Sequence, residues 1–205
     1  MFSGSEHAIN RRGFLYAATA AVGVAGVTAA AWPLIDQMNP DAHARAAGDT
    51  LGVDAGGLQP AGRIVVHWRK YPIFVVRRTA AMLKAMQETS FVATLIDADS
   101  AKHQQPAYAK NWHRSIDPAY GVLVAVCTAC QCVPDYYADA SALTVAGGYM
   151  CPCCASRYDP AGRAFAGIAR YNLPVPPYVA TGPSKILLGK NAMDVAYSLD
   201  TVERI

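Results

Sequence analysis

The sequence predicts a mostly β protein in which one N-terminal transmembrane helix precedes an antiparallel β head. A charge-free run of 23 residues, from Gly13 to Ile35, lies close to the N-terminus. Short runs rich in β-branched residues, separated by Gly and Pro turns, fill much of the remaining chain. All six cysteines lie between Cys127 and Cys154, which indicates one local site rather than a scaffold of scattered disulfides.

The N-terminal run is long enough to cross a membrane. At about 1.5 Å per residue it reaches roughly 35 Å as a helix, and a bilayer core is about 30 Å thick. Arg11 and Arg12 precede it, as in a twin-arginine export signal. Such a pair stays on the cytoplasmic side. We therefore expect residues 1–36 to be a single-pass signal-anchor in a bacterial inner (cytoplasmic) membrane, with the head on the periplasmic side.

Two alternatives to an anchor stay open. A cleaved signal peptide is the stronger one, because Ala42-His43-Ala44 offers a small-x-small cleavage site. Against cleavage, the apolar run is longer than a usual signal core and ends in Trp32-Pro33-Leu34-Ile35. The other alternative is a buried core helix, which the length and the preceding arginines disfavour.

The head, residues 51–205, shows several elements in its sequence pattern. Residues 37–50 are small and polar and predict a flexible tether, or simply an irregular loop, before it. Arg69-Lys70 predicts a turn, and Thr79 is a candidate N-cap of a helix that reaches Thr89. The runs expected to form strands are 63–68, 71–78, 121–126, 185–188 and 195–199.

Composition excludes two broad classes. Apolar residues make up 53% of the 205 residues, which excludes a disordered chain. The formal net charge is only +3, from 18 basic and 15 acidic side chains, and no basic run follows. The charge balance therefore predicts no nucleic-acid partner.

Four cysteines form a spaced pair of motifs. Cys127 with Cys130, and Cys151 with Cys154, give C-x-x-C, twenty residues, and C-x-x-C. Two such knuckles can place four thiolates around a metal. The spacing therefore predicts a structural zinc site or an iron–sulfur centre.

The two other cysteines, Cys132 and Cys153, stand one beside each knuckle. In an exported protein they are natural disulfide partners. The alternative is a pair of ordinary disulfides with two free thiols, although six cysteines within 28 residues would staple a fold of this size in an unusual way. All five histidines precede the cysteines, and none is assigned as a ligand.

These features resemble the Rieske iron–sulfur subunit of ubiquinol–cytochrome c reductase over nearly the whole chain. The Arg-Arg signal-anchor and the small-residue tether belong to the likeness. The further shared motifs are YPIFVVRRT at 71–79, QQPAY at 104–108, HRS at 113–115, VCT at 126–128, CVP at 132–134, GGYMCPC at 147–153, SRYDPAGR at 156–163 and NLPVPP at 172–177.

The resemblance implies a Rieske-like antiparallel β head with a small cluster-binding subdomain at about 122–178. The family's loops are C-T-H-L-G-C and C-P-C-H-G-S, and they hold a [2Fe–2S] cluster. By this likeness Cys127 and Cys151 match the thiolate ligands of the cluster. Cys132 and Cys153 match the disulfide that joins the loops.

The resemblance also implies that the hydroxyls of Ser156 and Tyr158 hydrogen-bond the cluster sulfurs. It breaks at the two ligand histidines. Ala129 stands at the first position and has no ligand atom, and Cys154 stands at the second and offers a thiolate. Cys130, one residue past the first position, is the expected fourth ligand if the loop shifts.

The function implied by the family is electron transfer from ubiquinol to a c-type cytochrome, within an oxidoreductase that also contains cytochrome b and a cytochrome c-type subunit. The cofactor implied is a [2Fe–2S] cluster, with zinc as the alternative. The loops lack the imidazole that receives the quinol hydrogen bond and proton in the family. The alternative function is therefore a membrane-tethered protein with an all-Cys zinc or low-potential iron–sulfur knuckle that does not oxidise quinol.

Overall fold

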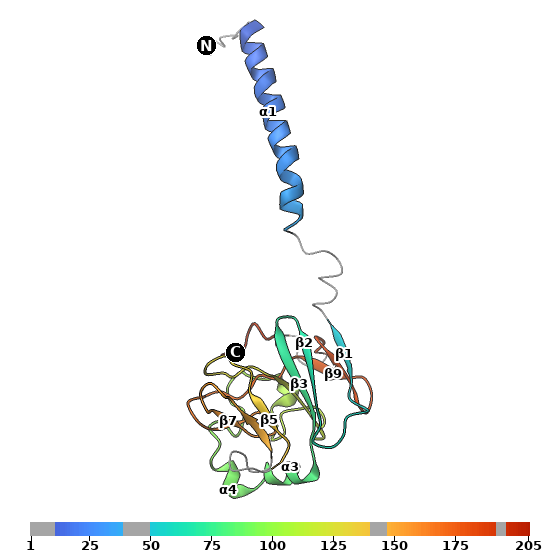
Figure 1. The fold of residues 1–205 in the computed structure, drawn as a ribbon, viewed down its shortest axis with the longest axis vertical. Helices are drawn as coiled ribbons and strands as arrows, with labels where there is room; N and C mark the ends of the chain where they lie inside the picture. The colour runs from blue at the N-terminus through green and yellow to red at the C-terminus, as the bar shows by residue number, and fades with distance from the viewer. Residues whose placement is uncertain (1–10, 39–49, 140–146, 192–195) are drawn as a thin grey trace, which may run out of the picture. The chain divides into compact units, whose positions relative to one another are not determined.

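The computed structural model describes residues 11–38, 50–139, 147–191 and 196–205, and the chain divides into two compact units, Met1–Arg45 and Ala46–Ile205. Helix α1 (Arg11–Asp36) is one continuous helix of 26 residues, none of them buried (Figure 1). Its large apolar side chains, such as Phe14 and Val22, are more than half exposed. The helix is therefore not packed as a core helix. By length and composition it fits a single-pass membrane anchor.

Most of the expected tether, residues 39–49, lies outside the described residues. The described part of the head contains three antiparallel sheets, ordered β1-β10-β9, β2-β3-β4 and β5-β6-β7-β8. The strands are β1 (Leu51–Asp54), β2 (Arg63–Trp68), β3 (Tyr71–Arg77), β4 (Tyr120–Val124), β5 (Asp135–Tyr137), β6 (Gly148–Met150), β7 (Arg157–Tyr158), β8 (Ala164–Ala166), β9 (Tyr178–Ala180) and β10 (Lys185–Leu188).

The central hairpin of the head follows the sequence pattern closely. Strands β2 and β3 pair from Arg63 opposite Val76 to Trp68 opposite Tyr71, so the turn falls at Arg69-Lys70. β3 also pairs with β4, and the apolar residues Ile73–Val76 are at most 1% exposed. A strand in the middle of a covered sheet is buried on both faces, which explains its continuous apolar run.

Short helices accompany the sheets: α3 (Ala80–Ala85), α4 (Thr89–Val92) and the 3₁₀ helix η1 (Ala107–Ala109). The hydroxyl of Thr79 accepts a hydrogen bond from the Met82 amide, so this residue is the N-cap that the sequence predicts. The expected helix to Thr89 is wrong in length, because α3 ends at Ala85. The carbonyl of Met86 accepts a hydrogen bond from the Arg163 guanidinium, a contact with a residue distant in sequence that helps hold this end of the helix.

The strand expected at 195–199 is also wrong for its described residues, 196–199. Tyr197 is buried and its hydroxyl donates to the Val175 carbonyl at 2.7 Å, although its backbone is not part of a strand. Ser198 and Thr201 form a local turn in place of a strand, through the hydrogen bonds of the Thr201 hydroxyl with the Ser198 backbone. Apolar side chains alternate in this segment as in a strand, but they fill the core from an irregular backbone.

Candidate metal centre

Two loops carry the six cysteines, and paired strands bring these loops together. Residues 127–132 link β4 to β5, and residues 151–156 form the turn between β6 and β7. β5 and β6 pair antiparallel with Asp135 opposite Met150. The first loop leads into the start of β5, and the end of β6 leads into the second loop. These two strand ends lie opposite each other, so the two loops lie side by side.

The first loop is closed by its own backbone. The amide of Cys127 donates to the Cys132 carbonyl, and the amide of Gln131 donates to the Cys127 carbonyl, both at 2.8 Å. Gln131 has φ +63°, in the left-handed region that reverses the chain. The reversal brings Cys130 back beside Cys127.

The second loop repeats this arrangement. The amide of Cys151 donates to the Ser156 carbonyl at 2.8 Å, and the amide of Ala155 donates to the Cys151 carbonyl at 2.9 Å. Ala155 has φ +54°, in the same left-handed region as Gln131 of the first loop. Each C-x-x-C motif therefore forms a knuckle that directs two sulfurs to one side.

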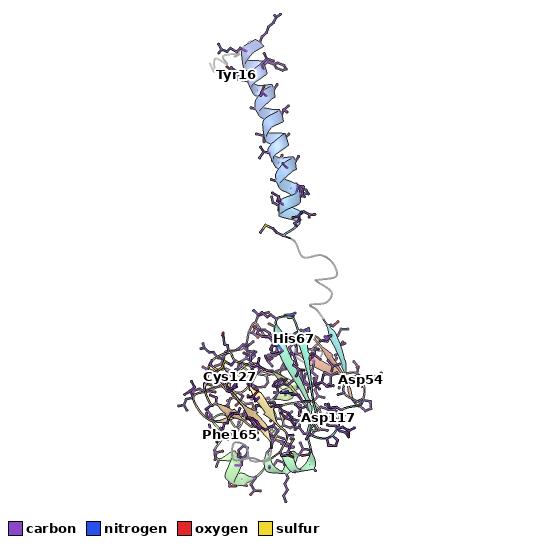
Figure 2. The ribbon with its side chains drawn as sticks, in the orientation of Figure 1. Tyr16, Asp54, His67, Asp117, Cys127 and Phe165 are labelled. Carbon is purple, nitrogen blue, oxygen red and sulfur yellow. A yellow bond between two sulfur atoms is a disulfide. The ribbon has the colours of Figure 1, made fainter. Side chains whose placement is uncertain are left out.

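The four knuckle sulfurs meet between the loops. The Sγ atoms of Cys127 and Cys154 are 3.6 Å apart, those of Cys130 and Cys151 are 3.2 Å apart, and those of Cys130 and Cys154 are 3.4 Å apart. All four lie within 4.8 Å of one another and are free thiols. Cys127, labelled in Figure 2, and Cys151 are fully buried, whereas the other two are partly exposed.

A disulfide between Cys132 and Cys153 joins the two loops at their edges. This is the pairing that both the exported location and the resemblance predict. The alternative of two ordinary disulfides is absent from the described residues, since Cys127, Cys130, Cys151 and Cys154 are unbonded. The disulfide holds the knuckles against each other with a sequence separation of 21 residues.

Replacing both Cys132 and Cys153 by alanine is expected to lower the free energy of unfolding by about 3 kcal/mol, because the unfolded chain regains the freedom of a loop of this length. Denaturant unfolding of the metal-loaded protein measures the loss. Adding a reductant should lower the free energy of unfolding of the oxidised parent protein by the same amount. It should leave the free energy of unfolding of the double variant unchanged. Equal stability of the double variant and the oxidised parent would contradict the clamping role.

The Ser156 hydroxyl lies 3.1 Å from the Cys154 sulfur. Its oxygen accepts the amide of Ala169 at 3.1 Å, which leaves the hydroxyl proton available to the thiolate. Gly167, at φ +90°, lets the chain pass close to this point: a Cβ there would lie 2.5 Å from the Ser156 Cα. The segment after β8 therefore packs tightly against the second knuckle and positions this hydroxyl.

The Tyr158 hydroxyl lies 3.3 Å from the Cys127 sulfur. Its oxygen also accepts the amide of Thr128 at 3.3 Å and lies 3.2 Å from the Thr128 hydroxyl. The Thr128 hydroxyl donates to the Tyr171 carbonyl, so the tyrosine proton is shared between the sulfur and this hydroxyl. No sequence pattern marks Thr128 for this role, apart from its place directly after a knuckle cysteine.

Three of the thiols at this centre have shifted pKa values. Burial raises the pKa of the Cys151 thiol, and its contacts with the neighbouring thiols raise it further. Burial also raises the pKa of Cys130. At Cys154 burial acts in the same direction, but the hydroxyl and amide of Ser156 and two neighbouring thiols outweigh it and lower the pKa to about 6. A cation among them would stabilise all four thiolates at once.

The candidate centre contains no imidazole among the residues that the structure describes. Ala129 lies in the first knuckle and has no ligand atom. Of the described histidines, His67, His103 and His113, none belongs to a group of possible metal ligands. His113 instead contacts the Ser115 hydroxyl at 2.8 Å. The donor set at the described centre is thiolate alone.

Comparisons with known proteins agree with this architecture. A family model described as the TAT signal of the ubiquitinol–cytochrome c reductase Fe–S subunit matches residues 1–41. The ubiquinol–cytochrome c reductase iron–sulfur subunit of Blastochloris viridis is 41% identical over 192 residues, covering 92% of this chain and 98% of the relative. That of Allochromatium vinosum is 39% identical over 186 residues, covering 88% and 89%.

Among solved structures, a chain titled "Hyperthermophilic respiratory Complex III" aligns with a TM-score of 0.48 and 19% identity, over 83% of this chain and 98% of that one. The match to the TAT-signal model, the apolar helix and the β head with paired cysteine loops define a Rieske-type iron–sulfur protein. The chain belongs to the family of ubiquinol–cytochrome c reductase iron–sulfur subunits. It is therefore related to a component of an oxidoreductase along nearly its whole length.

The residues present do not fit the His-ligated cluster that the family implies. Such a cluster places two imidazoles on one iron, and the two matching positions here are Ala129 and Cys154. Thiolates give softer, more negatively charged ligation than neutral imidazoles. The four free cysteines form a candidate tetrathiolate site in a Rieske-type frame.

Proposed function

We propose that the chain is the electron-carrying subunit of a quinol–cytochrome c reductase in a bacterial inner membrane, with its head on the periplasmic side. The observation that carries the proposal is the set of four free thiols, mutually within 4.8 Å, at the loops where the family binds its redox centre. The partners follow from the family: cytochrome b, a c-type cytochrome subunit and ubiquinol. The organisation proposed is residues 1–36 as anchor, 37–50 as tether and 51–205 as head.

The site residues divide into ligands and hydrogen-bond donors. Cys127, Cys130, Cys151 and Cys154 would hold the metal, and bound iron would supply one-electron transfer. The hydroxyls of Ser156 and Tyr158 lie at two of these sulfurs, where a donated proton spreads the negative charge and favours the reduced state. These hydrogen bonds raise the reduction potential of the metal, whereas ligation by thiolates lowers it.

The missing imidazole limits what the centre does with protons. A metal-bound thiolate near neutral pH is a poor acceptor for the proton of a quinol hydroxyl. We therefore expect ubiquinol oxidation by this chain to be slow unless another group takes the proton. The second candidate function, a membrane-tethered protein with a structural zinc knuckle, is favoured by the same observation, because a closed four-thiolate site is typical of structural zinc.

Purification of the tagged full chain from solubilised membranes of its source organism distinguishes the two functions. We expect haem b and haem c to co-purify, and ubiquinol to reduce cytochrome c slowly in the purified complex. The Cys151→Ser variant should lose this activity, whereas Val65→Ala, at an exposed residue of β2, should keep it. Absence of haem from the purified protein would favour the zinc-knuckle function.

Topology gives a separate prediction. Protease added to intact spheroplasts should release the head, because α1 is the one described segment that can span the membrane and Arg11-Arg12 should keep its N-terminal end inside. Immunoblotting with an antibody to the head follows the released fragment. A cytoplasmic marker protein must stay intact in the same sample. Protection of the head together with that marker would contradict the proposed orientation.

A further inference from the structure

The number of metal ions that the tetrathiolate site accepts can be worked out from its sulfur separations. Three contacts of 3.2 to 3.6 Å each join a sulfur of the first knuckle to a sulfur of the second. The knuckles therefore interlock rather than face each other across a gap. The remaining separations do not exceed 4.8 Å.

A single tetrahedral ion matches these separations. With metal–sulfur bonds of about 2.3 Å, the edges of a tetrahedron of thiolates are about 3.8 Å long. The three contacts of 3.2 to 3.6 Å lie below this value, and the upper limit of 4.8 Å for all pairs lies above it. An ion at the centre of the four sulfurs needs only a small outward movement of the closest pair.

A two-iron cluster does not match them. Two tetrahedra that share an edge of bridging sulfides hold the thiolates of different irons at least about 5.3 Å apart. Pairing Cys127 with Cys130 or with Cys151 puts the 3.6 Å contact of Cys127 with Cys154 across the two irons. Pairing Cys127 with Cys154 puts the 3.4 Å contact of Cys130 with Cys154 across them. Every division of the four ligands into two pairs therefore fails.

The surrounding structure holds the four ligands of this chain in the closed arrangement. The disulfide joins Cys132, two residues past one ligand, to Cys153, two residues past another. The amide of Cys127 donates to the Cys132 carbonyl, and the amide of Cys151 donates to the Ser156 carbonyl, which closes each loop around its own two ligands. Cys127 and Cys151 are fully buried. Binding of a single ion leaves these contacts in place.

We propose that Cys127, Cys130, Cys151 and Cys154 bind one tetrahedral metal ion, iron or zinc, in place of the family's [2Fe–2S] cluster. The inference deepens the proposed function and rests on it only for the choice of iron. Its geometric basis is the sulfur arrangement alone. In this chain Ala129 and Cys154 replace the family's two histidines, and Cys130 is an additional ligand. These three differences together then change the site from a cluster site to a single-ion site.

Metal and acid-labile sulfide analysis of the purified full chain tests the proposal, combined with X-ray absorption at the metal edge. We expect one metal ion per chain, no inorganic sulfide, a shell of four sulfurs and no metal–metal scattering. Iron supports both the single-ion site and the proposed function. Zinc supports the single-ion site and overturns electron transfer at it. Two irons with two sulfides overturn the inference and leave the proposed function standing.

Variants and metal titration complete the test. Cys130→Ala should lose the ion, whereas Ala129→Ser, in the same knuckle, should keep it, with circular dichroism showing that both fold. If the protein is purified without metal, titration of the oxidised chain with Co²⁺ alone should saturate at one equivalent and give the absorption of tetrahedral thiolate ligation. Absence of binding in this titration, or retention of the ion by Cys130→Ala, would also overturn the inference.

Discussion

The Asp159→Asn variant is expected to lose about 3 to 5 kcal/mol of unfolding free energy, because it leaves a buried guanidinium without its counter-charge. Asp159 and Arg163 form an ion pair at 2.7 Å in which both side chains are almost completely buried. The carboxylate also accepts the amides of Ala161 and Arg163, at 2.9 and 2.7 Å. An asparagine amide would direct an N–H group at one of these donors.

The exposed pair of Arg69 and Asp200 provides the matched control. These charges are 3.8 Å apart, and their side chains are 42% and 73% exposed. Removing such a pair is expected to change stability by less than about 1 kcal/mol. Denaturant unfolding of Asp159→Asn and Asp200→Asn against the parent measures both effects. Similar small losses for the two variants would show that the buried pair does not hold the loop after β7.

The loss at Asp159 should extend to the metal centre. Asp159 follows Tyr158 directly, and the Arg163 guanidinium also reaches the Met86 carbonyl at the end of α3. The turn from Asp159 to Arg163 therefore fixes the strand that presents Tyr158 to Cys127. We expect faster release of the metal to a chelator from Asp159→Asn than from Asp200→Asn.

Local patterns in the sequence predict the parts of this structure that local interactions hold. The β2–β3 hairpin follows from two apolar runs separated by Arg69-Lys70, and its register agrees with that turn. The cap at Thr79 follows from a hydroxyl residue before a helical run. The knuckles follow from C-x-x-C spacing, because each is closed by hydrogen bonds within six residues.

The contacts that buried charged side chains make with distant parts of the chain have no such pattern in the sequence. Arg114 is fully buried and donates to the carbonyls of Ala161 and Leu173 and to the Gln105 side chain. Burial lowers the pKa of Arg114 to about 10, and the hydrogen-bonded oxygens around it stabilise the charged guanidinium. Sequence motifs identify the residue but not these partners. The contact of Arg163 with the end of α3 is equally distant in sequence and equally unmarked by any motif.

The distances between the four sulfurs likewise cannot be predicted from the sequence. C-x-x-C spacing is equally compatible with one zinc, one iron or a two-iron cluster. What distinguishes them is how close together the four sulfurs lie, and the spacing of the motifs does not contain these distances. The spacing predicts the ligands, and the separations of their sulfurs decide how many ions fit.

Restoring the family's loop residues is expected to convert the site to a two-iron, His-ligated centre. The variant combines five substitutions: Ala129→His, Cys130→Leu, Gln131→Gly, Cys154→His and Ala155→Gly. It keeps the buried thiols and the disulfide. Gln131 and Ala155 have φ of +63° and +54°, which glycine adopts without the penalty that other residues incur. The two glycines therefore fit the existing backbone, and the substitution of ligands is the main change.

The five-residue variant is expected to have a reduction potential in the range of His-ligated two-iron centres, about −150 to +300 mV. This range lies a few hundred millivolts above that of plant-type all-cysteine clusters, near about −400 mV. Neutral imidazoles add no negative charge, and Tyr158 keeps its contact with the Cys127 sulfur. The Ser156 hydroxyl, which contacts the Cys154 sulfur in the parent, becomes available to the cluster. Redox titration followed by electron paramagnetic resonance measures the potential, together with iron and sulfide content. Exposed imidazoles should also make the potential pH-dependent above neutrality, because the oxidised cluster acidifies them.

The double glycine variant, Gln131→Gly with Ala155→Gly, separates the effect of the ligands from that of the backbone. It should keep the metal content of the parent, since all four thiols remain. Failure of the five-residue variant to bind a cluster, with the glycine variant intact, would mean that the frame around the loops no longer accommodates two irons. A His-type spectrum from the parent chain would instead mean that a distant histidine is recruited, which the described positions of His67, His103 and His113 argue against. Conversion by five substitutions would show that the ligand residues alone separate this tetrathiolate centre from the family's cluster.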